Sequence, residues 1–208
     1  MSSADARADR ALLLTPGAGA SRDHISLVAV EEALAPIVVE RMDFPYRRAG
    51  RKAPDRPPVL VAAVREGAAA LAERTGLPPE RLVLGGRSMG GRMCSMAVAE
   101  GLPALALVLV SYPLHPPGRP DNLRTEHLPR LDVPCLFVSG TRDAFSTPEE
   151  LEAATALIPG PVTHVWLEGG DHGLARHHPE VAAVVADWVR GLPPASSRRR
   201  RAAPGPRG

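Results

Sequence analysis

Aromatic residues are scarce in this sequence, because Phe, Trp and Tyr make up only 3% of its 208 residues. Large rings usually supply much of the area buried in a core, so we expect a core built from Ala, Val and Leu. Lysine is nearly absent too, since Lys52 is the only lysine among 25 Lys and Arg residues. The many arginines and the 23 prolines are typical of coding bias in a GC-rich genome, and the formal net charge is only +2. We therefore expect no nucleic-acid partner.

Cysteines and long apolar runs are also few. The two cysteines, Cys94 and Cys135, fall inside a predicted helix and a predicted strand, which favours buried, reduced thiols over a disulfide or a nucleophile. No apolar run approaches the ~20 residues needed to cross a bilayer, so no membrane partner is expected. Residues 1–10 lack the apolar stretch of a secretory signal. The expected location is cytoplasmic.

Stretches that predict strands alternate with stretches that predict helices. Strands are expected at 11–15, 37–42, 81–85, 104–110, 135–139 and 162–167, and helices at 24–35, 59–74, 89–100, 148–157 and 179–190. Because the strands are largely unbroken apolar runs, they indicate an α/β fold with a mostly parallel central sheet and helices on both faces.

The length of the chain fits a single domain. We place this domain at 11–192, after a flexible N-terminus at 1–10 and before a disordered tail at 193–208 that is rich in Arg and Pro. Two long loops dense in proline, 43–58 and 111–132, lie within the domain.

The most informative motif is Gly86-Arg87-Ser88-Met89-Gly90, a G-x-S-x-G between a predicted strand and a predicted helix. In that context the serine lies on a sharp turn whose strained backbone pushes the hydroxyl out of the sheet edge. Gly86 and Gly90 are expected because a Cβ there would collide as strand and helix fold back on each other. Ser88 is therefore the candidate nucleophile.

A serine nucleophile needs a base to take its proton and an acid to orient that base. Ligands bind beyond the carboxyl ends of the strands in such a sheet, so both partners should follow strands. Asp143 follows the strand at 135–139, and His172 follows the strand at 162–167 in a loop flanked by glycines. Asp171 adjoins the histidine and is poorly placed to orient it. The alternative for Asp143 is a cap on the helix that follows.

The oxyanion formed by attack on a carbonyl needs two backbone N–H donors. One is expected from Met89, the residue after the nucleophile. The other is expected from Ala18, because Gly17 and Gly19 let its amide turn toward the site. The alternative for this loop is a plain glycine turn.

With these motifs the chain resembles the α/β-hydrolase superfamily over almost all of its predicted domain. It looks most like the small, lidless branch related to dienelactone hydrolases, which includes testis-expressed hydrolase-like proteins and the hydrolase-like domain of a non-specific-lethal complex subunit. The resemblance is carried by residues 85–92, 111–115, 136–140 and 50–56. It implies Ser88 as nucleophile, Asp143 as acid and His172 as base, without a cap domain. Many relatives carry His-Gly after the first strand, where this chain has Pro16-Gly17.

These observations predict a serine hydrolase that cleaves a small carboxylic ester or thioester through an acyl-enzyme, without metal or cofactor. The alternatives are a peptidase or amidase of the same fold, or a hydrolase-like domain that only binds partners. Substrate contacts are expected from Arg87, Tyr46, Tyr112 and His115. Other basic residues on loops could ring the mouth and favour an anionic substrate, although solvated arginines are the simpler interpretation: Arg22, Arg47, Arg48, Lys52 and Arg119.

Overall fold

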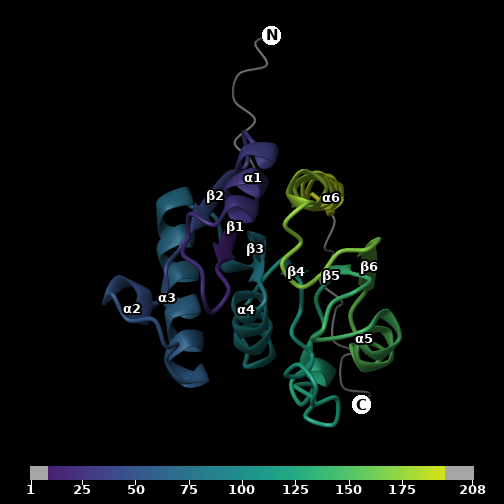
Figure 1. Ribbon diagram of the computed structural model, residues 1–208. Coiled ribbons are helices and arrows are strands. Elements are labelled where there is room, and N and C mark those ends of the chain that lie inside the picture. The colour runs from purple at the N-terminus through teal and green to yellow at the C-terminus, as the bar shows by residue number, and fades with distance from the viewer. Residues whose placement is uncertain (1–8, 195–208) are drawn as a thin grey trace, which may run out of the picture.

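The computed structural model describes residues 9–194, and its centre is one six-stranded parallel sheet (Figure 1). The order of the strands is β2-β1-β3-β4-β5-β6, and every neighbouring pair is parallel. The strands are β1 (Ala11–Thr15), β2 (Val38–Arg41), β3 (Leu82–Arg87), β4 (Ala106–Val110), β5 (Cys135–Gly140) and β6 (Val162–Leu167). The predicted parallel sheet is confirmed, with each strand within a few residues of its expected place.

Helices cover both faces of the sheet. The helices are α1 (Ile25–Leu34), α2 (Pro45–Arg48), α3 (Pro57–Thr75), α4 (Met89–Ala99), α5 (Pro148–Thr155) and α6 (His178–Gly191). Alternate side chains of β1 show the two layers, because Leu12 and Leu14 pack with α1 and α6 whereas Leu13 packs with α3 and α4. The four central strands β1, β3, β4 and β5 are buried along almost their whole length, which explains their largely unbroken apolar sequences.

Local sequence signals set the helix ends. Two prolines open α3, and Gly76 closes it in the left-handed conformation, at φ 70°, with its N–H bonded to the Ala72 carbonyl. Thr147 and Glu150 form a reciprocal capping box at the start of α5. The short helix α2 lies within the predicted loop 43–58, because four residues are too few to show a helical period.

Residue 10 belongs to the fold rather than to a flexible N-terminus. The buried Arg10 guanidinium donates to the Val189 carbonyl at 2.6 Å and to the Leu192 carbonyl at 2.8 Å. Asp9 is ion-paired with Arg10 and with Arg81. The start of β1 is thereby tied to the end of α6. The rest of the expected N-terminus, and residues 195–208 of the expected tail, lie outside the described residues.

The strand order creates a switch point at the carboxyl edge of the sheet. The chain runs from β1 outward to β2, then returns across to β3 on the other side of β1. Connections that leave in opposite directions open a crevice at the ends of β1 and β3, where such sheets bind ligands. Within residues 9–194 no inserted domain covers this edge.

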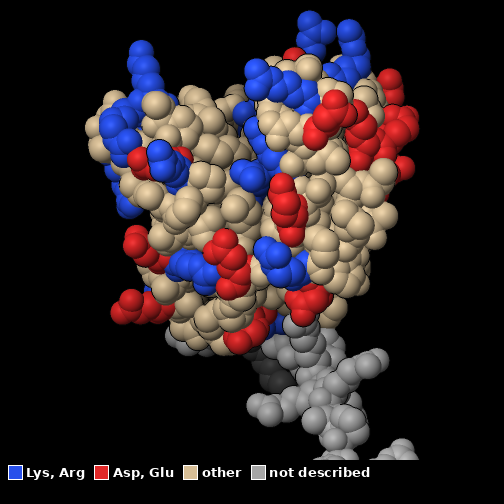
Figure 2. All heavy atoms as spheres, turned by 90° about the horizontal axis from the view of Figure 1, so that it is seen from below, with Lys and Arg blue, Asp and Glu red and all other residues tan. Residues whose placement is uncertain are grey.

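The cysteines, the apolar character of the helices and the surface charge can each be compared with what the sequence predicts. Cys94 and Cys135 are free and buried, as expected. No helix among the described residues has both the length and the apolar character required to span a bilayer. On the face shown in Figure 2, basic and acidic side chains are interspersed among neutral ones rather than separated.

Candidate active site

Ser88 stands on the sharp turn between β3 and α4. Its backbone angles are φ 51° and ψ −121°, a strained conformation that non-glycine residues seldom adopt. The Ser88 N–H donates to the Val110 carbonyl of β4 at 2.8 Å, and its carbonyl accepts from the Arg92 N–H at 3.1 Å. The turn is therefore tied to both the sheet and the helix, which fixes the direction of the hydroxyl.

The glycines around the turn are required by the neighbouring strand β1. A Cβ on Gly86 would lie 2.2 Å from Thr15 Oγ1, and one on Gly90 would lie 2.5 Å from the same atom. The expected collision between strand and helix is found instead at Gly91, whose Cβ would lie 2.8 Å from the Gly86 carbonyl oxygen. The motif glycines thus let β1 and its loop come close to Ser88.

Ser88, His172 and Asp143 form a continuous chain of hydrogen bonds. The Ser88 hydroxyl lies 2.8 Å from Nε2 of His172. The other ring nitrogen, Nδ1, lies 2.9 Å from Oδ1 and 2.8 Å from Oδ2 of Asp143. A carboxylate only accepts hydrogen bonds, so Nδ1 carries the proton and Nε2 is free to accept from the hydroxyl. The Asp143 side chain is fully buried, which keeps water from competing for it.

Two glycines allow the loops of the acid and the histidine to touch. A Cβ on Gly140 would lie 2.1 Å from the Gly170 carbonyl oxygen. That carbonyl accepts from the Arg142 N–H at 2.9 Å. Asp171, the alternative acid, accepts instead from the N–H groups of Gly173 and Leu174. It therefore shapes the histidine loop and does not contact the ring.

We expect Gly140→Ala to lower kcat for 4-nitrophenyl acetate by ~10². The added Cβ must push the loop of Asp143 away from the loop of His172, and displacing such groups by about 1 Å typically slows a reaction by that factor. Gly191→Ala is the matched control, since a Cβ there meets nothing within 4 Å. Steady-state kinetics on both variants makes the comparison. Equal activity in the two variants would show that the close approach is unnecessary.

Two side chains hold the histidine in ways that the sequence did not predict. The Phe145 ring stacks on the His172 ring with centroids 3.9 Å apart, and the Phe145 N–H donates to Asp143 Oδ1 at 2.8 Å. Arg87 donates from Nη2 to the His172 carbonyl at 2.7 Å, and burial lowers the pKa of its guanidinium. No periodic signal marks Phe145, because its contact exists only once two distant loops meet. Arg87 was expected at the substrate, and its contact is with the histidine loop instead.

A cavity of about 330 Å³ opens onto Ser88. Met89 and Ala18, the residues expected to donate to the oxyanion, both lie on its wall. Tyr46 reaches Ala18 from behind, because its buried hydroxyl donates to the Ala18 carbonyl at 2.7 Å. The remaining wall combines apolar and charged side chains: Asp55, Pro57, Leu60, Arg92, Met93, Pro113, Arg124 and Phe145.

With this geometry in place, comparison with known proteins identifies the family. A family model described as an alpha/beta hydrolase domain matches residues 8–184, most of the sequence. The chain belongs to the α/β-hydrolase family. This α/β hydrolase is similar to pimeloyl acyl-carrier-protein methyl ester esterase of Stenotrophomonas maltophilia, at 38% identity over 68 residues, 33% of this chain and 26% of the relative. The chain thus matches about a quarter of the length of that curated relative.

Solved structures with the same fold include enzymes of several kinds. A dienelactone hydrolase from Anabaena variabilis aligns with a TM-score of 0.69 at 20% identity, covering 88% of this chain and 87% of that one. An alpha-beta serine hydrolase homologue from Coxiella burnetii aligns with a TM-score of 0.69 at 16% identity, covering 85% and 84%. At these identities the likeness establishes the fold of the α/β hydrolase.

Three residues expected to touch the substrate do not reach the cavity of this α/β hydrolase. Tyr46 and Tyr112 are buried behind its wall, where Tyr112 donates to the Arg124 carbonyl at 3.1 Å. His115 is buried beside Glu150, with Nε2 3.3 Å from its carboxylate. Their loops are close to the site, but all three side chains are buried and contact other parts of the fold instead.

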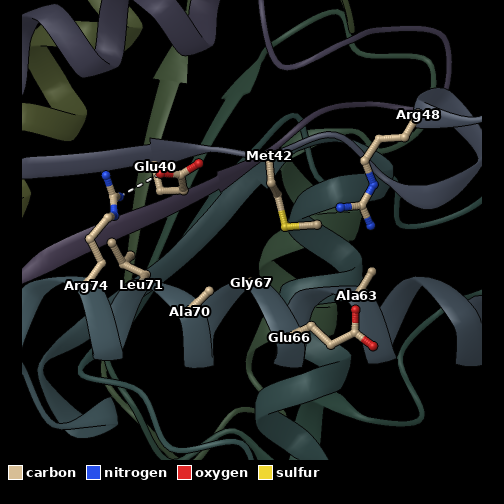
Figure 3. Close-up of a pocket in the computed structure, with 9 residues that line it drawn as sticks. All are labelled: Glu40, Met42, Arg48, Ala63, Glu66, Gly67, Ala70, Leu71 and Arg74. Atoms are coloured by element: carbon tan, nitrogen blue, oxygen red, sulfur yellow. Dashed lines mark hydrogen bonds and ion pairs between the residues drawn. The ribbon is translucent and has the colours of Figure 1, made fainter.

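The basic loop residues that could have ringed the mouth do not line this cavity. None of them is on the wall of the cavity at Ser88, which Arg92 and Arg124 line instead. Figure 3 shows where Arg48 lies, in a separate cavity of about 360 Å³ between β2 and α3. There Glu40 and Arg74 form an ion pair at 2.6 Å on the other side of Met42. The two cavities share no lining residue.

Proposed function

We propose that this α/β hydrolase is a serine hydrolase that cleaves a small carboxylic ester or thioester through an acyl-enzyme on Ser88. The observation that carries the proposal is the unbroken hydrogen-bond chain from the Ser88 hydroxyl through His172 to Asp143. A serine hydroxyl is a weak nucleophile at neutral pH, and a neutral imidazole in contact with it supplies the base it needs. The exposure of Ser88 to the cavity gives a carbonyl access to the hydroxyl.

In the acylation step, the Ser88 oxygen attacks the carbonyl carbon while Nε2 of His172 takes its proton. Asp143 stabilises the imidazolium that forms and holds the ring in the required tautomer. The tetrahedral intermediate collapses when the carbon–oxygen or carbon–sulfur bond to the leaving group breaks, and the imidazolium protonates the departing atom. Water then attacks the acyl-enzyme by the same route, so Ser88 regains its proton from His172.

The negative charge of each tetrahedral intermediate falls on the former carbonyl oxygen. The N–H groups of Met89 and Ala18 are our proposed donors to it, since both residues line the cavity beside Ser88. The bond from Tyr46 to the Ala18 carbonyl fixes that peptide before substrate arrives. Donors held in place in this way typically contribute ~3–4 kcal/mol to the transition state.

A fluorophosphonate probe tests the nucleophile directly. We expect the wild-type protein to be labelled and Ser88→Ala to remain unlabelled. Ser111→Ala is the matched control, because Ser111 also has a positive φ, of 50°, yet is fully buried at the end of β4. Labelling of Ser88→Ala at the wild-type level would refute the proposal.

Substrate length follows from the size of the cavity. We expect acetyl and butyryl 4-nitrophenyl esters to have a higher kcat/KM than the dodecanoyl ester, because a cavity of about 330 Å³ without a cap cannot enclose a long chain. Initial rates across the series, measured below micelle formation, provide the comparison. A kcat/KM that rises steadily with acyl length would indicate an apolar tunnel.

A further inference from the structure

Arg92 has an unusual position for an arginine. It lies one helical turn after Ser88 on α4, and its side chain lines the cavity that opens onto the nucleophile. Its Nε atom is buried without a hydrogen-bond partner. Among residues 9–194, no carboxylate or carbonyl pairs with its guanidinium. A buried polar group in this state destabilises the fold unless a ligand satisfies it.

Arg124 brings a second positive charge to the same wall. Its guanidinium donates to the Pro113 carbonyl at 3.2 Å, and no carboxylate in the described part of the chain pairs with it. Burial, followed by the charge of Arg92, lowers the pKa of Arg124. Because both guanidinium groups line the same cavity, their like charges repel each other.

The surrounding groups do not neutralise this charge. Asp55 also lines the cavity, but both of its carboxylate oxygens accept from Arg51, at 2.7 and 3.1 Å. His127 lies behind Arg92, and burial lowers its pKa to about 4, so it is neutral at neutral pH. The wall of the cavity at Ser88 therefore carries two arginines against one carboxylate, and that carboxylate is already paired.

We propose that Arg92 and Arg124 together bind a negatively charged group of the substrate, so that the substrate of Ser88 is a small ester or thioester that also carries an anion. This rests on the function proposed above. Guanidinium groups bind carboxylates and phosphates through paired, charge-assisted hydrogen bonds. An anion between them would satisfy the buried Nε and remove the repulsion.

The geometry limits the size of such a substrate. Side chains one helical turn apart have Cβ atoms about 5–6 Å apart, so the scissile carbonyl and the anion must lie within one small molecule. Leu60, Met93 and Phe145 supply apolar wall around them. A short dicarboxylic acid esterified at one end has these properties.

Matched substrates test the inference. We expect wild-type protein to hydrolyse monomethyl glutarate with a kcat/KM 10- to 100-fold above that of its neutral isostere, in which a carboxamide replaces the free carboxylate. Arg92→Met should remove this preference by slowing hydrolysis of the charged ester more than hydrolysis of the neutral one. Arg74→Met, which removes an arginine on α3 in the other cavity, should retain it. Methanol release measures both reactions.

A binding measurement separates the inference from the proposed function. Glutarate or inorganic phosphate at fixed ionic strength should raise the Tm of wild-type and Ser88→Ala protein but leave Arg92→Met unchanged. Without ligand, Arg92→Met should unfold at the same or a higher temperature than wild type, because it removes a repulsive charge. Equal rates on the two esters, or equal Tm shifts in wild type and Arg92→Met, would overturn the inference while leaving Ser88 labelling intact.

Discussion

Ser88→Ala is expected to lower kcat for 4-nitrophenyl acetate and butyrate by ~10⁶, because the substitution removes the attacking oxygen and leaves only binding and the oxyanion donors. The fold should persist, since alanine is smaller than serine and meets the same positive φ that Ser88 already adopts. Steady-state kinetics gives the rate, and circular dichroism with a thermal melt gives the fold.

Traces of a host esterase would hide this loss. The variant should therefore be purified in parallel with wild type, from a strain whose own esterase activity after the same purification has been measured. Turnover by folded Ser88→Ala close to that of wild type would falsify the assignment of Ser88. An unfolded variant would be replaced by Ser88→Gly, which relieves the positive φ and still lacks the hydroxyl.

Asp143→Asn is expected to reduce kcat by ~10⁴ at neutral pH. The amide can still bond to His172, but its NH₂ group favours the tautomer in which Nε2 carries the proton and cannot accept from Ser88. The acceptor for the Phe145 N–H is retained through the amide oxygen, so the loop should keep its shape. The pH profile of kcat should be measured along with its value, because a wrong tautomer lowers the plateau.

Asp171→Asn provides the matched control. It also removes one carboxylate beside the histidine, yet its Oδ1 contacts are with the N–H groups of Gly173 and Leu174, which an amide oxygen can still accept. We expect this variant to lose less than ~10-fold, as for a loop residue whose hydrogen bonds survive. A greater loss in Asp171→Asn than in Asp143→Asn would reverse the assignment of the acid.

The fold could be predicted from sequence because its signals are local and repeated. Apolar strands covered on both faces, proline at helix starts and Gly76 at a helix end each act within a few residues. Helix α2 was missed because one turn leaves no periodicity. Arg10 was assigned to a flexible terminus because its partners, the Val189 and Leu192 carbonyls, are at the other end of the domain.

The candidate site likewise contains residues that local signals predict and residues that they do not. Ser88, Asp143 and His172 could be predicted to lie together because each follows a strand, and parallel strands bring their carboxyl ends to one edge. The side chains around them depend on which way each loop residue turns. Tyr46 and Tyr112 turn inward, so they hold the wall rather than form it. The position of Arg92 on the cavity wall could have been predicted. Residues four apart lie on the same side of a helix, and Arg92 comes four residues after Ser88.

The hydrogen bonds between Arg10 and the end of α6 have a consequence for folding during synthesis. Synthesis proceeds from the N-terminus, and domains generally fold as units during it. The face of β1 that carries Leu12 and Leu14 is covered by α6 as well as by α1, and Arg10 finds its carbonyls only on α6 and just beyond it. A nascent chain that has reached the turn at Ser88 therefore still exposes apolar surface, and chaperone contact should persist until α6 has left the ribosome.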